Sequence, residues 1–128
     1  MGTFSSQPSK RSTKQAGDAA ELAALQYLTA QGLHLLDRNF RSPGRGGGEI
    51  DLIMREPDGT HVFVEVRKRA TQNHGGAAAS VGFVKQRRIV FAARHYLSRL
   101  RVEPPCRFDV MVLNGVDMEW IKAAFDAS

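Results

Sequence analysis

Acidic residues in the middle of apolar segments are the first candidates for chemistry in this chain. Residues 49–53 read as a strand, and because strand side chains alternate between faces, Glu49 and Asp51 share one face with Ile53. In the segment 61–67, which is rich in valine, Glu65 lies within a second apolar strand. A carboxylate in such surroundings is costly unless a cation or a metal ion pairs with it.

An acid on a helix raises the same question. Residues 18–31 are rich in Ala and Leu and predict a helix that ends at Gly32. Glu21 stands three, four and seven residues before Ala24, Leu25 and Leu28, which places it on the apolar face of this helix.

Two interpretations of these acids stay open on pattern alone. In the first, Asp51 and Glu65 form structural salt bridges with Arg67 or Arg69, and Glu21 lies at the rim of the core. In the second, the carboxylates hold Mg²⁺ or Mn²⁺, which prefer oxygen ligands. An ion held in this way can polarise a phosphate and activate water for phosphodiester hydrolysis.

The elements that must position these acids follow from the patterns along the chain. Their order is helix, strand, hairpin, helix and strand, which predicts an α/β fold with a small mixed central sheet flanked by helices. The segment 119–125 is ambiguous. The expected helices are Asp18–Gln31 and Val81–Leu100, and the expected strands are Leu33–Phe40, Glu49–Met54, His61–Arg67 and Arg107–Leu113.

Length and composition fit one domain of 128 residues. We expect residues 1–15 to form a disordered basic tail and residues 16–128 to form the domain. Cys106 is the single cysteine, so no internal disulfide can form, which favours a reducing compartment and a cytoplasmic location. The sequence has no long apolar run, so we expect no membrane partner.

The charge distribution predicts a polyanionic partner. The net charge is +5, and the segment 67–101 carries basic residues and no acid. Arg87, Arg94 and Arg101 recur every seven residues and share a face if the helix reaches Arg101. A solvated helix face is the alternative. Because no aromatic residue is interleaved in a way that suggests base stacking, we expect contacts to phosphates rather than to bases. The residues expected to bind nucleic acid are Lys85, Arg87, Arg88, Arg94, Arg101, Lys68 and Arg69.

Several ordered motifs between residues 17 and 125 resemble the YraN-like family of small bacterial proteins. That family is similar to Holliday-junction resolvases and to the restriction-endonuclease-like PD-(D/E)XK superfamily. The motifs are Gly17-x-x-Ala20-Glu21-x-x-Ala24-x-x-Tyr27-Leu28, Arg38-Asn39-Phe40-Arg41, Gly48-Glu49-Ile50-Asp51-Leu52-Ile53, Phe63-Val64-Glu65-Val66-Arg67, Lys85-Gln86-Arg87-Arg88-Ile89 and Arg107-Phe108-Asp109-Val110.

The resemblance implies a restriction-endonuclease-like fold and a role for each acid. Asp51 matches the first metal-binding Asp of the superfamily, and Glu65 matches the acid of its D/E-x-K motif. Glu21 matches a helical Glu that some resolvases add to the site, and Glu49 is a further candidate ligand on the face of Asp51. The implied cofactor is Mg²⁺ or Mn²⁺. The implied substrate is nucleic acid, with branched or damaged DNA foremost, and the implied assembly is a homodimer.

One position departs from the superfamily pattern. Arg67 stands where the motif has Lys, and Arg cannot act as a base because it stays protonated. Three outcomes remain open: Arg67 supplies only electrostatic stabilisation, another Lys reaches the site, or the site binds without catalysis. Lys68 points to the opposite strand face, so Lys85, at the start of the second helix, is the better substitute.

Three functional hypotheses therefore stand. The first is a metal-dependent endonuclease-like domain that uses Asp51, Glu65, Arg67, Glu21 and Lys85 to hydrolyse phosphodiester bonds. The second is a catalytically inactive nucleic-acid-binding module on the same fold, which Arg67 favours. The third is a protein-interaction scaffold, which predicts neither DNA binding nor metal uptake.

Overall fold

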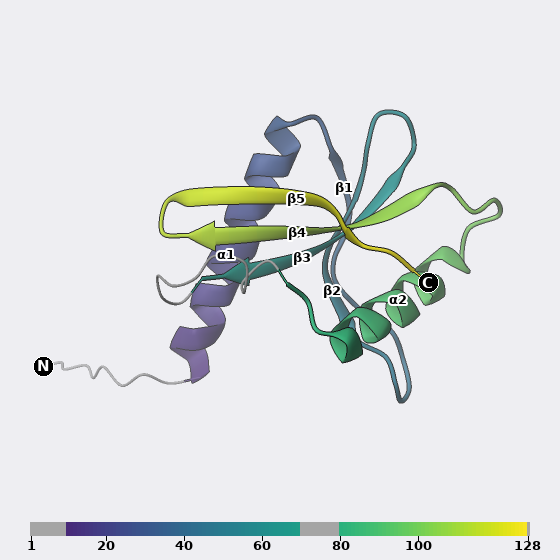
Figure 1. Cartoon of the computed structure of the whole chain (residues 1–128), viewed down its shortest axis with the longest axis horizontal. Coiled ribbons are helices and arrows are strands. Elements are labelled where there is room, and N and C mark those ends of the chain that lie inside the picture. Colours follow the sequence, from purple (N-terminus) through teal and green to yellow (C-terminus); the bar gives the residue numbers. More distant parts are fainter. Residues whose placement is uncertain (1–9, 70–79, 128) are drawn as a thin grey trace, which may run out of the picture.

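The computed structural model describes residues 10–69 and 80–127, and for residues 10–16 it describes the backbone alone. Two helices and five strands follow one another as α1 (Lys10–Ala30), β1 (His34–Arg41), β2 (Glu49–Arg55), β3 (His61–Lys68), α2 (Phe83–Leu97), β4 (Cys106–Asn114) and β5 (Asp117–Phe125). Figure 1 shows the strands as one sheet with a helix in front of it and a helix behind it.

The sheet has the strand order β1-β2-β3-β4-β5. Strands β1, β2 and β3 form an antiparallel meander, β4 runs parallel to β3 after the α2 connection, and β5 returns antiparallel to β4. The sheet is therefore mixed, as the sequence predicts. The ambiguous segment 119–125 belongs to β5, an edge strand that pairs with β4.

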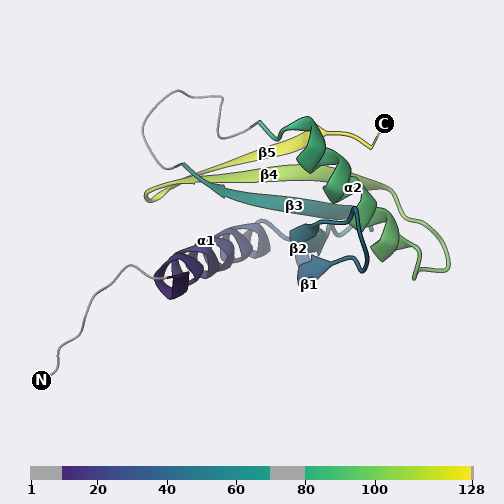
Figure 2. The ribbon, with the colours of Figure 1, turned by 90° about the horizontal axis from the view of Figure 1, so that it is seen from below.

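The helices cover opposite faces of the sheet (Figure 2). On one face, α2 buries Ile89, Ala93 and Leu97 against a core cluster that includes Phe63 and Val110. On the other face, α1 packs its small and apolar residues against strand residues of the opposite alternation phase. That second cluster consists of Ala20, Ala24, Leu28, Leu33, Leu52, Met54, Val62, Val64, Met111 and Leu113.

The helix boundaries differ from the predicted ones. Helix α1 begins at Lys10, eight residues before the predicted start, and so includes part of the segment 1–15 that the sequence analysis assigns to the tail; residues 1–9 lie outside the described residues. Its end is as predicted. Gly32 has φ +101°, and the Leu33 N–H donates to the Leu28 carbonyl, which is a glycine-dependent helix stop.

Helix α2 is shorter than the predicted segment 81–100. It spans Phe83–Leu97, and residues 98–101 form a turn that Ser98 begins as the C-cap. Arg101 therefore lies beyond the helix, so the condition under which Arg87, Arg94 and Arg101 would share one helix face is not met.

Candidate active site at the fork of two strands

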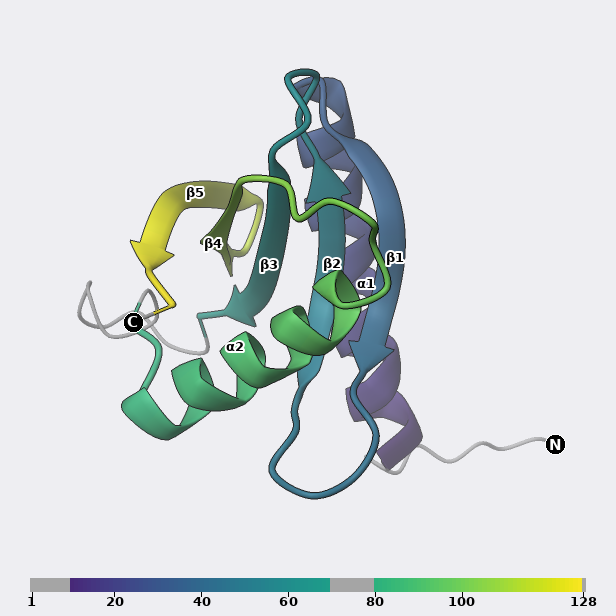
Figure 3. The same ribbon diagram turned by 90° about the vertical axis from the view of Figure 1, so that its right-hand side faces the viewer.

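Strands β2 and β3 separate at the two acids that the sequence singles out. Within the described residues, their ladder ends at the pair Leu52–Val64, so Asp51 and Glu65 occupy the next positions. Strand β2 stays paired with β1 as far as Glu49. In Figure 3, β2 and β3 lie side by side at one end and move apart as they pass α2. The acids lie at this fork.

The side chain of Asp51 closes the fork. Its Oδ2 accepts a hydrogen bond of 2.8 Å from the backbone N–H of Val66. This N–H lies beyond the end of the β2–β3 ladder, and the Asp51 carboxylate accepts its hydrogen bond in place of a partner strand. Ile50 and Ile53 both pack in the α2-side core, so β2 does not keep strict alternation here, and the prediction that Glu49, Asp51 and Ile53 share one regular face is wrong in detail.

The surroundings of Asp51 favour its protonated form. Burial, followed by the negative charge of Glu65, raises the pKa of Asp51 to about 7. The Val66 hydrogen bond opposes this shift, and the charges of Glu21 and Glu49 add to it. Among the side chains of residues 17–69 and 80–127, no cation forms an ion pair with Asp51. The fork thus concentrates negative charge on a partly buried carboxylate.

Glu65 has two cationic neighbours, and one of them comes from α2. Its side chain is almost fully buried, and Oε2 lies 3.2 Å from Lys85 Nζ and 3.7 Å from Arg67 Nε. The structure therefore brings Lys85 to the site, as expected for a Lys that substitutes for the one missing from the motif. Arg67 also donates from its NH1 group to the Ser80 carbonyl at 3.0 Å, which anchors its guanidinium to the backbone.

Glu21 reaches the same region from α1, but other side chains hold it. Its Oε1 accepts a hydrogen bond of 2.9 Å from Asn39 Nδ2 and lies 4.0 Å from Arg38. Asn39 occupies the β1 position opposite Asp51 and has φ +50°, a conformation that Asn tolerates better than most residues. Sequence reasoning missed Asn39 as a site residue, although it lies in one of the quoted motifs.

Glu49 lies at the rim of the fork. Its Oε1 is 3.3 Å from an Arg41 guanidinium nitrogen, and the Arg41 side chain is largely exposed. Next to it, Gly48 lies against α2: a Cβ at this position would be 2.9 Å from the Cβ of Arg88 and 3.2 Å from its backbone carbon. The glycine therefore permits the β1–β2 loop to touch α2, which is a second feature that sequence reasoning missed.

The donor set can be tested against a hard metal ion. Carboxylate oxygens are suitable ligands for Mg²⁺ or Mn²⁺, and Asp51 and Glu65 offer them where negative charge needs to be offset. As the side chains lie, however, no three His, Cys, Asp or Glu residues of the described part of the chain are grouped closely enough to hold an ion. Glu21 and Glu49 would have to leave Asn39 and Arg41 to complete the predicted set.

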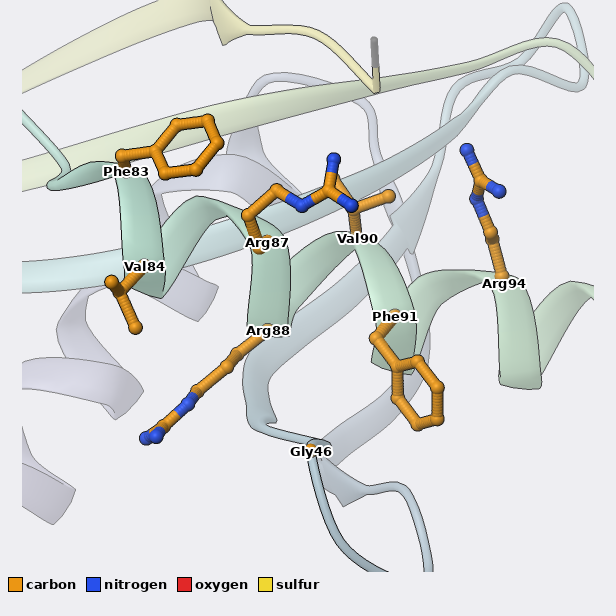
Figure 4. Close-up of a pocket in the computed structure, with 8 residues that line it drawn as sticks. All are labelled: Gly46, Phe83, Val84, Arg87, Arg88, Val90, Phe91 and Arg94. Atoms are coloured by element: carbon orange, nitrogen blue, oxygen red, sulfur yellow. The ribbon is translucent and has the colours of Figure 1, made fainter.

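The predicted nucleic-acid-binding residues divide between two sides of the molecule. Lys68 and Arg69 line a depression with Ala19, Ala20 and Ala23 of α1, so they lie on the α1 side of the sheet. The arginines of α2 lie on the other side and line a depression of about 340 Å³ together with Phe83 and Phe91 (Figure 4). Phe83 and Phe91 thus lie among these arginines, which is a further feature that sequence reasoning missed.

The fold and site define an α/β domain with a five-stranded mixed sheet and one helix on each face, compatible with a small restriction-endonuclease-like fold. Residues 20–113 match the model of the uncharacterised protein family UPF0102, and the chain belongs to this family, in agreement with the YraN-like resemblance.

Relatives from several bacteria bear the same family name. The chain is 68% identical to a UPF0102 protein of Albidiferax ferrireducens over 115 residues, which is 90% of each chain. It is 62% identical to one of Paracidovorax citrulli over 118 residues (92% of this chain, 87% of the relative). It is 58% identical to one of Polaromonas naphthalenivorans over 130 residues (94% of this chain, 85% of the relative). In the part of the chain that the structure describes, neither helix could cross a membrane.

Proposed function

We propose that this chain is a metal-dependent, endonuclease-like domain that binds nucleic acid and hydrolyses its phosphodiester bonds. What supports the proposal most is the convergence of Asp51, Glu65 and Lys85 where β2 and β3 separate next to α2. A perturbed carboxylate beside a second acid and an ammonium group is typical of a hydrolytic site. Branched or damaged DNA is the proposed substrate.

Each residue of the fork has a separate role in this proposal. Asp51 and Glu65 hold Mg²⁺ or Mn²⁺, with Glu21 and Glu49 as further ligands; the bound ion supplies activation of water and stabilisation of charge on the phosphate. Lys85, whose Nζ is 3.2 Å from Glu65, orients this carboxylate and can give a proton to the leaving oxygen. Arg67 stays protonated and contributes positive charge only.

The alternative is a nucleic-acid-binding module without catalysis on the same fold. Arg67 in place of the motif Lys favours it, and so do the separate partners that hold Glu21 and Glu49. The two functions differ in one measurable property, because both predict DNA binding and only the first predicts cleavage that depends on Asp51.

The test uses the full chain with junction, flap and plasmid DNA in Mg²⁺ or Mn²⁺. Cleavage by the unmodified protein, and its loss in both Asp51→Asn and Lys85→Gln, is the expected result. Glu119→Gln, an exposed acid on β5, is the matched control and should cleave normally. Cleavage that survives Asp51→Asn would reject this site, and DNA binding without cleavage in any variant, including Arg67→Lys, would favour the binding module.

A further inference from the structure

The outer face of α2 combines exposed aromatic rings with arginines. The side chains of Phe83, Val84 and Phe91 are 70%, 64% and 44% exposed, although apolar residues of a helix usually turn toward a core. Scattered exposed apolar residues need no explanation, but a cluster of three on one helix face does. We call this surface, made of Phe83, Val84, Arg87, Arg88, Phe91 and Arg94, the Phe–Arg face.

The Phe–Arg face has two flanks with the same composition (Figure 4). Phe83, Arg87 and Arg94 lie along one flank, and the Arg87 guanidinium is 5.8 Å from the centroid of the Phe83 ring. Val84, Arg88 and Phe91 lie along the other flank, on the side of Gly46 in the β1–β2 loop. Each flank therefore offers a phenylalanine ring together with at least one guanidinium group.

The chemistry of this face selects its occupant. Guanidinium groups attract phosphates, and exposed phenylalanine rings offer surfaces on which unpaired bases can stack. Among the residues that the structure describes, no acid lines the depression on this face, so nothing in this lining repels a polyanion. A second copy of the chain fits less well, because a twofold contact here would bring the arginines of each copy against those of the other.

We infer that the Phe–Arg face binds a nucleic-acid strand through unpaired bases, which stack on Phe83 and Phe91 while Arg87, Arg88 and Arg94 contact the phosphates. The two phenylalanines are eight residues apart, which is about 12 Å along a helix, so they contact different bases of one strand. This inference rests on the proposed function and narrows its substrate to DNA or RNA that exposes unpaired bases.

The position of the face relative to the fork agrees with this role. The same helix directs Lys85 to Glu65, and Gly48 of the loop that leads into β2 touches Arg88. A nucleic-acid strand that lies on the outer face of α2 is therefore held by the same helix that supplies the Lys85 cation to the site. A duplex cannot use the rings in this way, because its bases are paired and stacked.

The experiment measures binding in EDTA, so that cleavage does not interfere. Fluorescence anisotropy compares a labelled oligothymidylate of about 20 nucleotides with a blunt duplex of the same length. The full chain is compared with the double variants Phe83→Ala/Phe91→Ala and Phe83→Leu/Phe91→Leu, which remove the rings and keep different amounts of apolar surface. Val116→Ala, at an exposed valine of the β4–β5 turn, is the matched control.

We expect the unmodified protein to bind the single strand more tightly than the duplex. Both double variants should lose at least about tenfold in single-strand affinity, since stacking contributes about 1–3 kcal/mol per base, and less than about twofold in duplex affinity. The control should match the unmodified protein. The rings are exposed, so thermal melting curves of all variants should coincide within about 2 °C.

Several results would overturn the inference. One is an unmodified protein that binds the duplex as tightly as the single strand. Another is that the double variants lose affinity for the duplex and for the single strand by the same factor. A third concerns the oligomeric state: sedimentation velocity shows a dimer of the unmodified protein and a monomer of the alanine variant, and both bind the single strand with the same affinity. The rings would then bind a second copy of the chain. Retained single-strand affinity in the ring variants together with cleavage that depends on Asp51 would reject stacking and leave the proposed function intact.

Discussion

Asp109 and Asp51 are both acids of the inner strands, and the protein surrounds them in opposite ways. Asp109 is fully buried on β4, and both of its oxygens accept hydrogen bonds. The Arg107 guanidinium donates at 3.0–3.2 Å, Trp120 Nε1 at 2.9 Å, and the Ala123 N–H at 3.0 Å. Asp51, in contrast, accepts one hydrogen bond within the described residues, from Val66, and has acidic neighbours that raise its pKa.

The difference distinguishes a structural carboxylate from a candidate functional one. Asp109 holds a register shift between β4 and β5 in place, because it satisfies the N–H of Ala123, whose φ is +51°. Its charge is compensated by Arg107, which also pairs with Glu56 at 2.6 Å. Asp51 also satisfies a strand N–H, but none of the cations whose side chains the structure describes forms an ion pair with it. Burial alone therefore does not identify the site; incomplete compensation does.

The largest expected effect comes from removing the structural carboxylate. Asp109→Ala leaves the partly buried Arg107 with Glu56 as its remaining partner and leaves the donors of Trp120 and Ala123 unsatisfied. We expect a loss of about 3–5 kcal/mol in the free energy of unfolding, measured by urea denaturation. Glu119→Ala, on the exposed side of the neighbouring β5, should lose less than about 0.5 kcal/mol. Equal losses in the two variants would contradict this view of Asp109.

The second effect has the opposite sign. Asn at position 51 can still accept from the Val66 N–H but carries no charge. Asp51 binds its proton more tightly in the folded chain than in the unfolded chain. The stability that this contributes is present below the ordinary carboxyl pKa and is lost as pH rises through about 7. At about pH 8 in EDTA, we therefore expect Asp51→Asn to be more stable than the unmodified protein, by on the order of 1–4 kcal/mol.

Unfolding curves between about pH 4 and 8 measure this difference. The gap between the two proteins should be small at the acid end and should widen with pH. Glu119→Gln is the charge-matched control and should show no such gap. A constant gap across the range, or a less stable Asp51→Asn at high pH, would mean that Asp51 is compensated in the way that Asp109 is.

The two carboxylates differ also in how far the sequence reveals them. The alternating apolar residues of the segments 49–53 and 61–67 predict the hairpin on which Asp51 and Glu65 lie, and the place of Lys85 at a helix start indicates that it can approach them. The same alternation cannot show that β2 and β3 separate at Asp51, because the fork depends on long-range contacts with α2. The capture of Glu21 by Asn39 depends on a positive φ that no pattern encodes.

The sequence predicts that α2 forms, but it predicts less well which side chains of this helix are exposed and where the helix ends. Ile89, Ala93 and Leu97 recur at helical spacing and form the buried side of the helix. The same spacing gives no role to Phe83 and Phe91, whose rings are exposed in the structure. Turns after Leu97 end the helix early and leave Arg101 outside it. Helix ends depend on capping and packing, which composition describes poorly.

A third prediction concerns an external cation. If Asp51 is left for a metal ion to compensate, Mg²⁺ or Mn²⁺ should stabilise the folded chain at about pH 8 and should have no effect on Asp51→Asn. At a metal concentration ten times the dissociation constant, the expected gain is about 1.4 kcal/mol. Thermal denaturation with and without the ion measures it. A gain that persists in Asp51→Asn would place the ion elsewhere.

The smallest expected change in stability comes from Lys85. This side chain is half exposed, so its ion pair with Glu65 is screened by solvent, and Lys85→Gln should cost less than about 1 kcal/mol. Arg41→Gln, which breaks the more exposed pair with Glu49, is the matched control and should cost less than about 0.5 kcal/mol. Urea denaturation at low and high salt measures both, and the difference between the variants should shrink as salt is added.

Lys85→Gln and Arg41→Gln should differ far more in cleavage activity than in stability. If Lys85 works on Glu65 and on the leaving oxygen, Lys85→Gln should lower cleavage by about 10²-fold or more, whereas Arg41→Gln should lower it by less than about threefold. The measurement is a single-turnover rate on flap DNA with both proteins folded to the same extent. A Lys85→Gln protein that is markedly unstable yet cleaves normally would place Lys85 with Arg107, as a structural partner of a buried acid, and not in the site.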